Sequence, residues 1–80
     1  MMMQSGSAEE NFLEVAIAAI PRVTEIITGL PAEYRAGALE VAERRYMDAA
    51  QNFGCADVAA RTMVTEVMSN LRTDVGAVAA

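Results

Sequence analysis

Apolar side chains recur at intervals of three and four residues along three segments of the chain, which is the spacing of one face of an α-helix. In the first segment these positions hold Leu13, Ala16, Ile20, Val23, Ile27 and Leu30. Ser7 is followed three residues later by Glu10, the pattern of a capping box that satisfies free amides at a helix start. The pattern predicts an N-terminal tail over residues 1–7 and a helix over residues 8–28.

The helical phase of this first segment continues straight through Pro21, although proline removes one backbone hydrogen bond. Pro21 falls on the same side as Glu14 and Glu25, so the lost bond would open towards water. We therefore expect one helix that is kinked at Pro21. Gly29 is expected to end it in a left-handed conformation, and Pro31 is expected to fix the first turn of the next helix.

The second helix is expected from Ala32 to Asn52 or Phe53, because Gly54 is placed as its stop. Its inward face is rich in small side chains, which let a neighbouring helix approach closely. The residues on that face are Ala38, Leu39, Ala42, Tyr46, Ala49, Ala50 and Phe53.

The third helix is expected from about Ala56 to Thr73, with Gly76 as its end and residues 76–80 as a tail. Its apolar stripe consists of Ala60, Met63, Val64, Val67, Met68, Leu71 and Val75. Met63 and Met68 are therefore expected in the core rather than on a binding surface. No segment alternates with period two over the length of a strand, so we predict an all-α fold, a small three-helix bundle over residues 8–75.

The apolar arc of the first helix is wider than a helix packed on one side of a small bundle needs. It runs from Val15 and Ile26 round to Ile17 and covers roughly 200° at 100° per residue. We expect part of this arc to remain as a patch that another chain covers, and a helical homodimer is the first expectation. A helical hairpin that takes its third helix from a second protomer would give the same periodicities.

Composition removes most catalytic chemistry. The 80 residues include no lysine and no histidine, and 6 basic against 11 acidic side chains give a net charge of -5. Schiff-base chemistry and the commonest general base are therefore absent, and a single cysteine without histidine makes a poor metal site. We expect no enzyme activity, no cofactor and no metal. The acidic balance also disfavours nucleic acid and anionic membrane surfaces.

The single cysteine indicates a reducing compartment, and the longest early apolar run, residues 15–20, is too short for a signal core or a membrane span. We therefore expect a cytoplasmic protein without a membrane segment. Sixteen alanines and the exclusive use of arginine are typical of a GC-rich bacterial genome. Cys55, just before the third helix, is either a reactive thiol or a small buried apolar residue, and the lack of an activating histidine favours the second interpretation.

These observations favour a small acidic interaction module or regulatory subunit that self-associates and binds a partner protein through apolar helix faces. The predicted contact residues are Phe12, Val15, Ala19 and Ile26 on the first helix and Tyr34, Val41 and Arg45 on the second. Arginine and tyrosine are common anchors in desolvated interfaces. The alternative is an acidic inhibitor or nucleic-acid mimic that blocks a basic site. Its weakness is that arginines are interleaved with the acidic residues.

Overall fold

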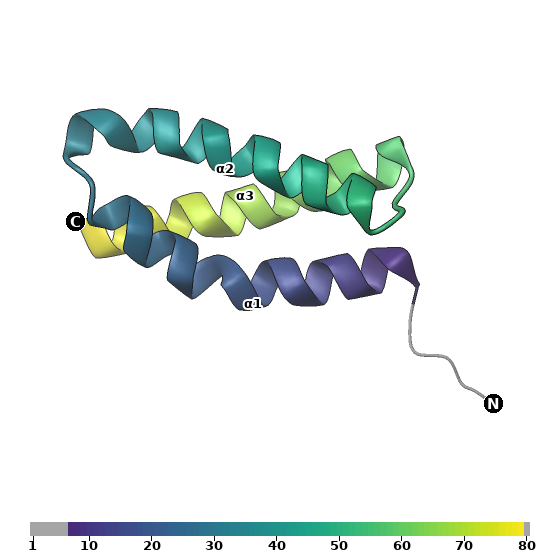
Figure 1. Cartoon of the computed structure of the whole chain (residues 1–80). Helices are drawn as coiled ribbons and strands as arrows, with labels where there is room; N and C mark the ends of the chain where they lie inside the picture. Colours follow the sequence, from purple (N-terminus) through teal and green to yellow (C-terminus); the bar gives the residue numbers. More distant parts are fainter. Residues whose placement is uncertain (1–6, 80) are drawn as a thin grey trace.

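The computed structural model describes residues 7–79, and within them the chain forms three helices that pack against one another (Figure 1). They are α1 (Ala8–Thr28), α2 (Ala32–Asn52) and α3 (Asp57–Ala79). The all-α three-helix bundle predicted from the sequence is confirmed. Residues 1–6 of the predicted N-terminal tail and residue 80 of the C-terminal tail lie outside the described residues.

The start of α1 is the predicted capping box. The Glu10 amide donates to the Ser7 hydroxyl at 3.2 Å, and the Ser7 amide donates to the Glu10 carboxylate at 3.1 Å. Two of the amides that a helix start leaves without intrahelical partners are therefore satisfied. The helix continues from Ala8 to Thr28 with Pro21 inside it, which confirms the predicted bounds.

The prediction that Gly29 is left-handed is wrong. Gly29 has φ -75° and ψ -12°, which is right-handed backbone. From α2, the Arg35 guanidinium donates to the carbonyl oxygens of Thr28 and Leu30, both at 3.1 Å. The Gly29 amide donates to the Glu25 carbonyl at 3.1 Å and the Leu30 amide to the Ile27 carbonyl at 3.0 Å, so α1 ends in right-handed turns. The Arg35 cation adds hydrogen bonds at this end of the helix.

The end of α2 is the glycine stop that the sequence predicts. Gly54 has φ +94°, and its amide donates to the Gln51 carbonyl at 3.0 Å. The next amide, of Cys55, donates to the Ala50 carbonyl at 3.0 Å. This pair of bonds is a Schellman motif, and it turns the chain sharply from α2 into α3.

The prediction that Gly76 ends the third helix is wrong, because α3 continues through Gly76 to Ala79. Val75 is buried in the core, and Ala77 and Val78 border a hollow beside α1. Gly76, Ala77 and Val78 are exposed, so packing does not hold this last turn. One glycine in a helix interior costs only about 1 kcal/mol, and alanine, the best helix former, follows it.

The core joins all three helices around the apolar stripe of α3. Its buried apolar members are Phe12, Ala16, Ile20, Ile27, Tyr46, Ala50, Cys55, Ala60, Met63, Val64, Val67, Met68, Leu71 and Val75. The predicted core positions of Met63 and Met68 are confirmed. Phe12 packs edge-on against Phe53, with ring centroids 6.0 Å apart at an interplanar angle of 70°, which is a favourable aromatic geometry.

Candidate functional site

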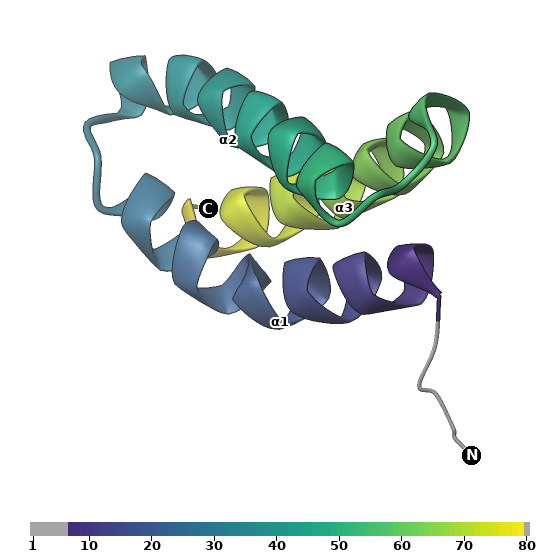
Figure 2. The same cartoon turned by 45° about the vertical axis from the view of Figure 1, so that its right-hand side comes forward.

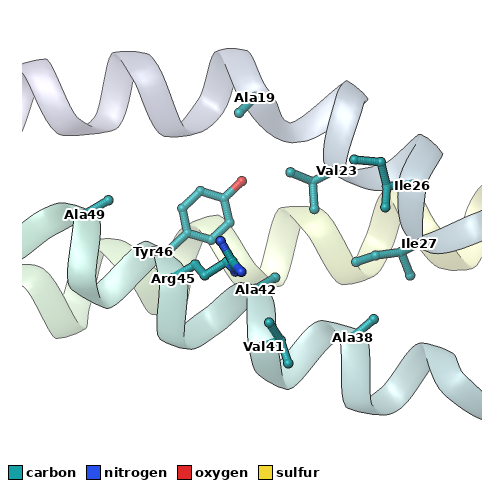
Figure 3. A pocket seen from close by; sticks show the side chains of 10 residues that line it. All are labelled: Ala19, Val23, Ile26, Ile27, Ala38, Val41, Ala42, Arg45, Tyr46 and Ala49. Atoms are coloured by element: carbon teal, nitrogen blue, oxygen red, sulfur yellow. The ribbon is translucent and has the colours of Figure 1, made fainter.

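A groove lies between α1 and α2. The two helices are joined by a short loop, residues 29–31, and they lie farther apart at that end than at the other (Figures 1 and 2). The groove has a volume of about 650 Å³. Figure 3 shows the residues that line it, which are Ala19, Val23, Ile26, Ile27, Ala38, Val41, Ala42, Arg45, Tyr46 and Ala49.

The groove is hollow because α2 presents small side chains to α1. Ala38, Ala42 and Ala49 follow one side of α2 at helical spacing, and Ala19 faces them from α1. Alanine side chains allow close approach, but α1 and α2 do not close over them. An apolar strip of both helices therefore stays open to solvent.

Two side chains bring polar groups to this groove, and they are neighbours in sequence. Arg45 is exposed. No carboxylate of residues 7–79 lies within 4.0 Å of its guanidinium, and the ion pair found in this span joins Arg72 to Glu43. Tyr46 is only 9% exposed, and its hydroxyl has no hydrogen-bond partner. Burial raises the pKa of the Tyr46 phenol above its ordinary value, because the charged form would lose its hydration.

Four of the seven contact residues predicted from the sequence line the groove: Ala19, Ile26, Val41 and Arg45. Val15 and Tyr34 lie outside it and are exposed, by 55% and 60%. Ile26 and Val41 are also open to solvent, by 55% and 41%. The apolar arc of α1 is therefore not fully used within the chain. We refer to Val15, Ala19, Ile26, Tyr34, Val41 and Arg45 together as the α1–α2 face.

The seventh predicted residue, Phe12, does not belong to this face. It is 1% exposed and packs inside the bundle against Phe53. The arc of α1 is wide enough to serve two surfaces, and Phe12 lies on the part directed at α2 and α3. Its assignment to an intermolecular contact is therefore corrected.

Sequence reasoning missed the open groove and the unpaired hydroxyl of Tyr46. The alanine pattern of α2 was a signal, but it predicted close approach of a neighbouring helix rather than an open space. Nothing in the sequence indicated that the Tyr46 hydroxyl would lack an acceptor. The helical position of Tyr46 predicts a core residue but does not show whether its hydroxyl is hydrogen-bonded.

A second, smaller hollow lies between α1 and the end of α3. Its volume is about 330 Å³, and it is lined by Pro21, Thr24, Asp74, Ala77 and Val78. Thr24 is buried, and its hydroxyl has no hydrogen-bond partner. The Thr24 hydroxyl is therefore a second unpaired buried polar group, and it lies at the edge of this hollow.

Cys55 is buried between the end of α2 and the start of α3. Burial raises the pKa of its thiol, and the nearby carboxylate of Glu9 raises the pKa further. Both effects disfavour the thiolate, which is the nucleophilic form. These features support the interpretation of Cys55 as a packing residue.

Between residues 7 and 79 the structure holds no cluster of three or more side chains suited to a metal ion. In the same span, no helix combines the length and the hydropathy needed to cross a membrane.

No protein-family model matches the chain, and comparisons with curated proteins and with solved structures gave no significant match. The class is therefore defined by the fold alone, an all-α three-helix bundle with an apolar groove on one side.

Proposed function

We propose that the chain is a small helical interaction module or accessory subunit that acts by binding and not by catalysis. It self-associates through the α1–α2 face to form a two-fold dimer. It also uses apolar helix surface to bind a partner protein. The observation that carries the proposal is the exposure of large apolar side chains along α1 and α2: Val15, Ile26, Tyr34 and Val41.

The composition of the face supports this proposal. Apolar surface gathered in one region favours association, because covering it removes water from contact with hydrocarbon. Arg45 and Tyr34 belong to the residue types that most often anchor protein interfaces. Two-fold dimers are the commonest assemblies that cover such a surface.

The proposal also includes a kink of α1 at Pro21. Pro21 lies in the middle of α1 on its exposed side, where the missing amide leaves a carbonyl one turn earlier without its helical donor. Proline is the commonest cause of sharp helix bends. A bend there would set the direction of the second half of α1, which carries Ile26.

We further propose that the module works in a reducing compartment, the cytoplasm. The support is the single free cysteine, which is buried in the core and cannot serve an intrachain disulfide.

Sedimentation velocity of matched variants tests the proposed interface. Val15→Asp places a charge on the α1–α2 face without touching the groove and is expected to shift a dimer to monomer. Ile17→Asp is the control, because Ile17 is on the same helix and is 51% exposed. It lies about 200° around the helix from Val15, so it points away from the α1–α2 face. Circular dichroism confirms that both variants remain helical. A dimer that survives Val15→Asp would overturn the proposed face.

Salt separates this proposal from the alternative of an acidic inhibitor. An apolar interface should respond weakly to salt, whereas a complex held by the excess of carboxylates should weaken steeply. Partner binding that falls by more than tenfold between low and high salt would favour the inhibitor.

A further inference from the structure

The size and shape of the groove suit a small elongated ligand. Its volume of about 650 Å³ lies within the range of small-molecule sites, roughly 300–1,000 Å³. Its lining on α2 extends from Ala38 to Ala49, a length of about 16 Å at 1.5 Å per residue. An aliphatic trough of this length matches an unbranched hydrocarbon chain.

Charge gives the groove a preference for one kind of head group. Arg45 lines the groove, and its guanidinium is not engaged in any salt bridge within residues 7–79. Guanidinium groups pair with carboxylates through two parallel hydrogen bonds. The charged side chain of the groove lining is therefore a cation, although the chain as a whole is acidic.

The Tyr46 hydroxyl is a second, independent indication. It is directed from α2 towards α1 in the space between the helices (Figure 3) and has no acceptor. A buried hydroxyl without a partner is unfavourable, and most such groups in folded proteins are satisfied by protein, water or ligand. The Tyr46 oxygen is closed to solvent in this conformation, so an anionic acceptor reaches it once the side chains around it move apart.

We propose that the groove binds a long-chain carboxylate. The hydrocarbon chain lies along the alanine-lined trough, and the carboxylate pairs with Arg45 and accepts a hydrogen bond from the Tyr46 hydroxyl. Burial of the chain supplies the apolar contribution to affinity, and the guanidinium selects an anion over a neutral head group. The site is formed by one chain, but Ala19, Ile26 and Val41 of its lining also belong to the α1–α2 face. A bound carboxylate and a second copy of the chain would therefore compete for this surface.

Calorimetric titration of the full chain with dodecanoate and with dodecanol, both below their aggregation limits, tests the proposal. We expect one dodecanoate per chain and at least tenfold weaker binding of dodecanol. Arg45→Gln should weaken dodecanoate binding at least tenfold and leave dodecanol unchanged. Arg44→Gln is the matched control on the same helix, since Arg44 is exposed and does not line the groove.

Two further variants test the position of the ligand. Ala42→Leu fills the trough and should abolish binding of both probes, while Tyr46→Phe should weaken dodecanoate binding severalfold. Thermal melts confirm that each variant folds. Failure of wild type to bind dodecanoate, or equal affinities of Arg45→Gln and Arg44→Gln, would overturn the proposal.

The same samples separate this proposal from self-association. One outcome is a dimer that Ala42→Leu dissociates, together with no binding of dodecanoate. In that case a second copy of the chain occupies the groove, and the ligand proposal is overturned. If dodecanoate binds as expected and the chain is monomeric at every concentration, the ligand site stands and self-association fails.

Discussion

Within residues 7–79, two buried hydroxyl groups have no hydrogen-bond partner. Each belongs to a side chain that has an apolar analogue of nearly the same shape. They are those of Tyr46 and Thr24. Removing an unpaired buried polar group eliminates a desolvation cost without losing a bond. At these two residues the sequence is therefore not optimal for stability, and both residues border hollows.

Tyr46→Phe and Thr24→Val should each leave the free energy of unfolding unchanged or raise it by up to about 1 kcal/mol. A gain of 1 kcal/mol corresponds to a melting temperature higher by roughly 4–8 °C in a domain of this size. Tyr34→Phe is the control and should have no effect, because Tyr34 is 60% exposed. A clear loss of stability in Tyr46→Phe would mean that the hydroxyl has a partner.

The raised pKa of Tyr46 predicts a loss of stability at alkaline pH. The folded state holds the phenol proton more tightly than the unfolded state, so this contribution is complete below the unfolded value, about 10. It decreases as the pH rises through the higher folded value. Urea unfolding at a series of alkaline pH values should show a steeper decline for wild type than for Tyr46→Phe. Parallel declines would contradict the burial of this phenol.

The correction of Phe12 is testable by comparing two residues of α1 that the sequence pattern groups together. Phe12→Ala should lower the free energy of unfolding by about 3–5 kcal/mol, since it removes a buried ring from the core. Val15→Ala should change it by less than about 0.5 kcal/mol, as is usual at the surface. Chemical denaturation measures both, and similar values would contradict their different placement.

Among the elements, the joint between α1 and α2 depends on Arg35, which donates to the carbonyls of Thr28 and Leu30. Arg35→Gln should lower the free energy of unfolding by about 1–2 kcal/mol, because it removes hydrogen bonds from a charged donor. Arg44→Gln, at an exposed position of the same helix, should have little effect. Equal midpoints of the two variants in urea would show that Arg35 does not stabilise the joint.

Two glycines that the sequence treats alike, as helix stops, have opposite roles. Gly54 has φ +94°, so Gly54→Ala should destabilise by about 1–2 kcal/mol. Gly76 lies inside α3, and a methyl group at its Cα would meet no neighbouring side chain or helix within 4 Å, so Gly76→Ala should stabilise by about 0.5–1 kcal/mol. Thermal melts decide this, and a destabilising Gly76→Ala would contradict the continuous α3.

Local patterns carried most of the information about the elements. The capping box at Ser7 and the apolar periodicities predicted the bounds of α1 and α2, because they depend on residues close together in sequence. Gly29 and Gly76 were predicted wrongly because a glycine permits a helix stop without requiring one: Gly29 stays right-handed, and α3 continues through Gly76. Glycine alone does not determine where a helix ends.

For the molecule as a whole, the excess apolar arc of α1 predicted that surface would remain unfilled, and Val15 and Ile26 are indeed exposed. The sequence could not predict that this surface borders a groove. The groove depends on how far α1 and α2 separate, which is a property of the packed bundle and not of either helix. The proposed interface and the proposed ligand site are both consequences of that separation.

Self-association through the α1–α2 face is tested most directly by the mass of the wild-type chain, measured by light scattering coupled to size exclusion over a dilution series at low and high salt. We predict twice the 8.5 kDa mass of one chain at both salt concentrations, because an apolar interface is only weakly screened. A mass of one chain throughout the series, or a dimer that dissociates as salt is raised, would contradict an apolar interface on this face.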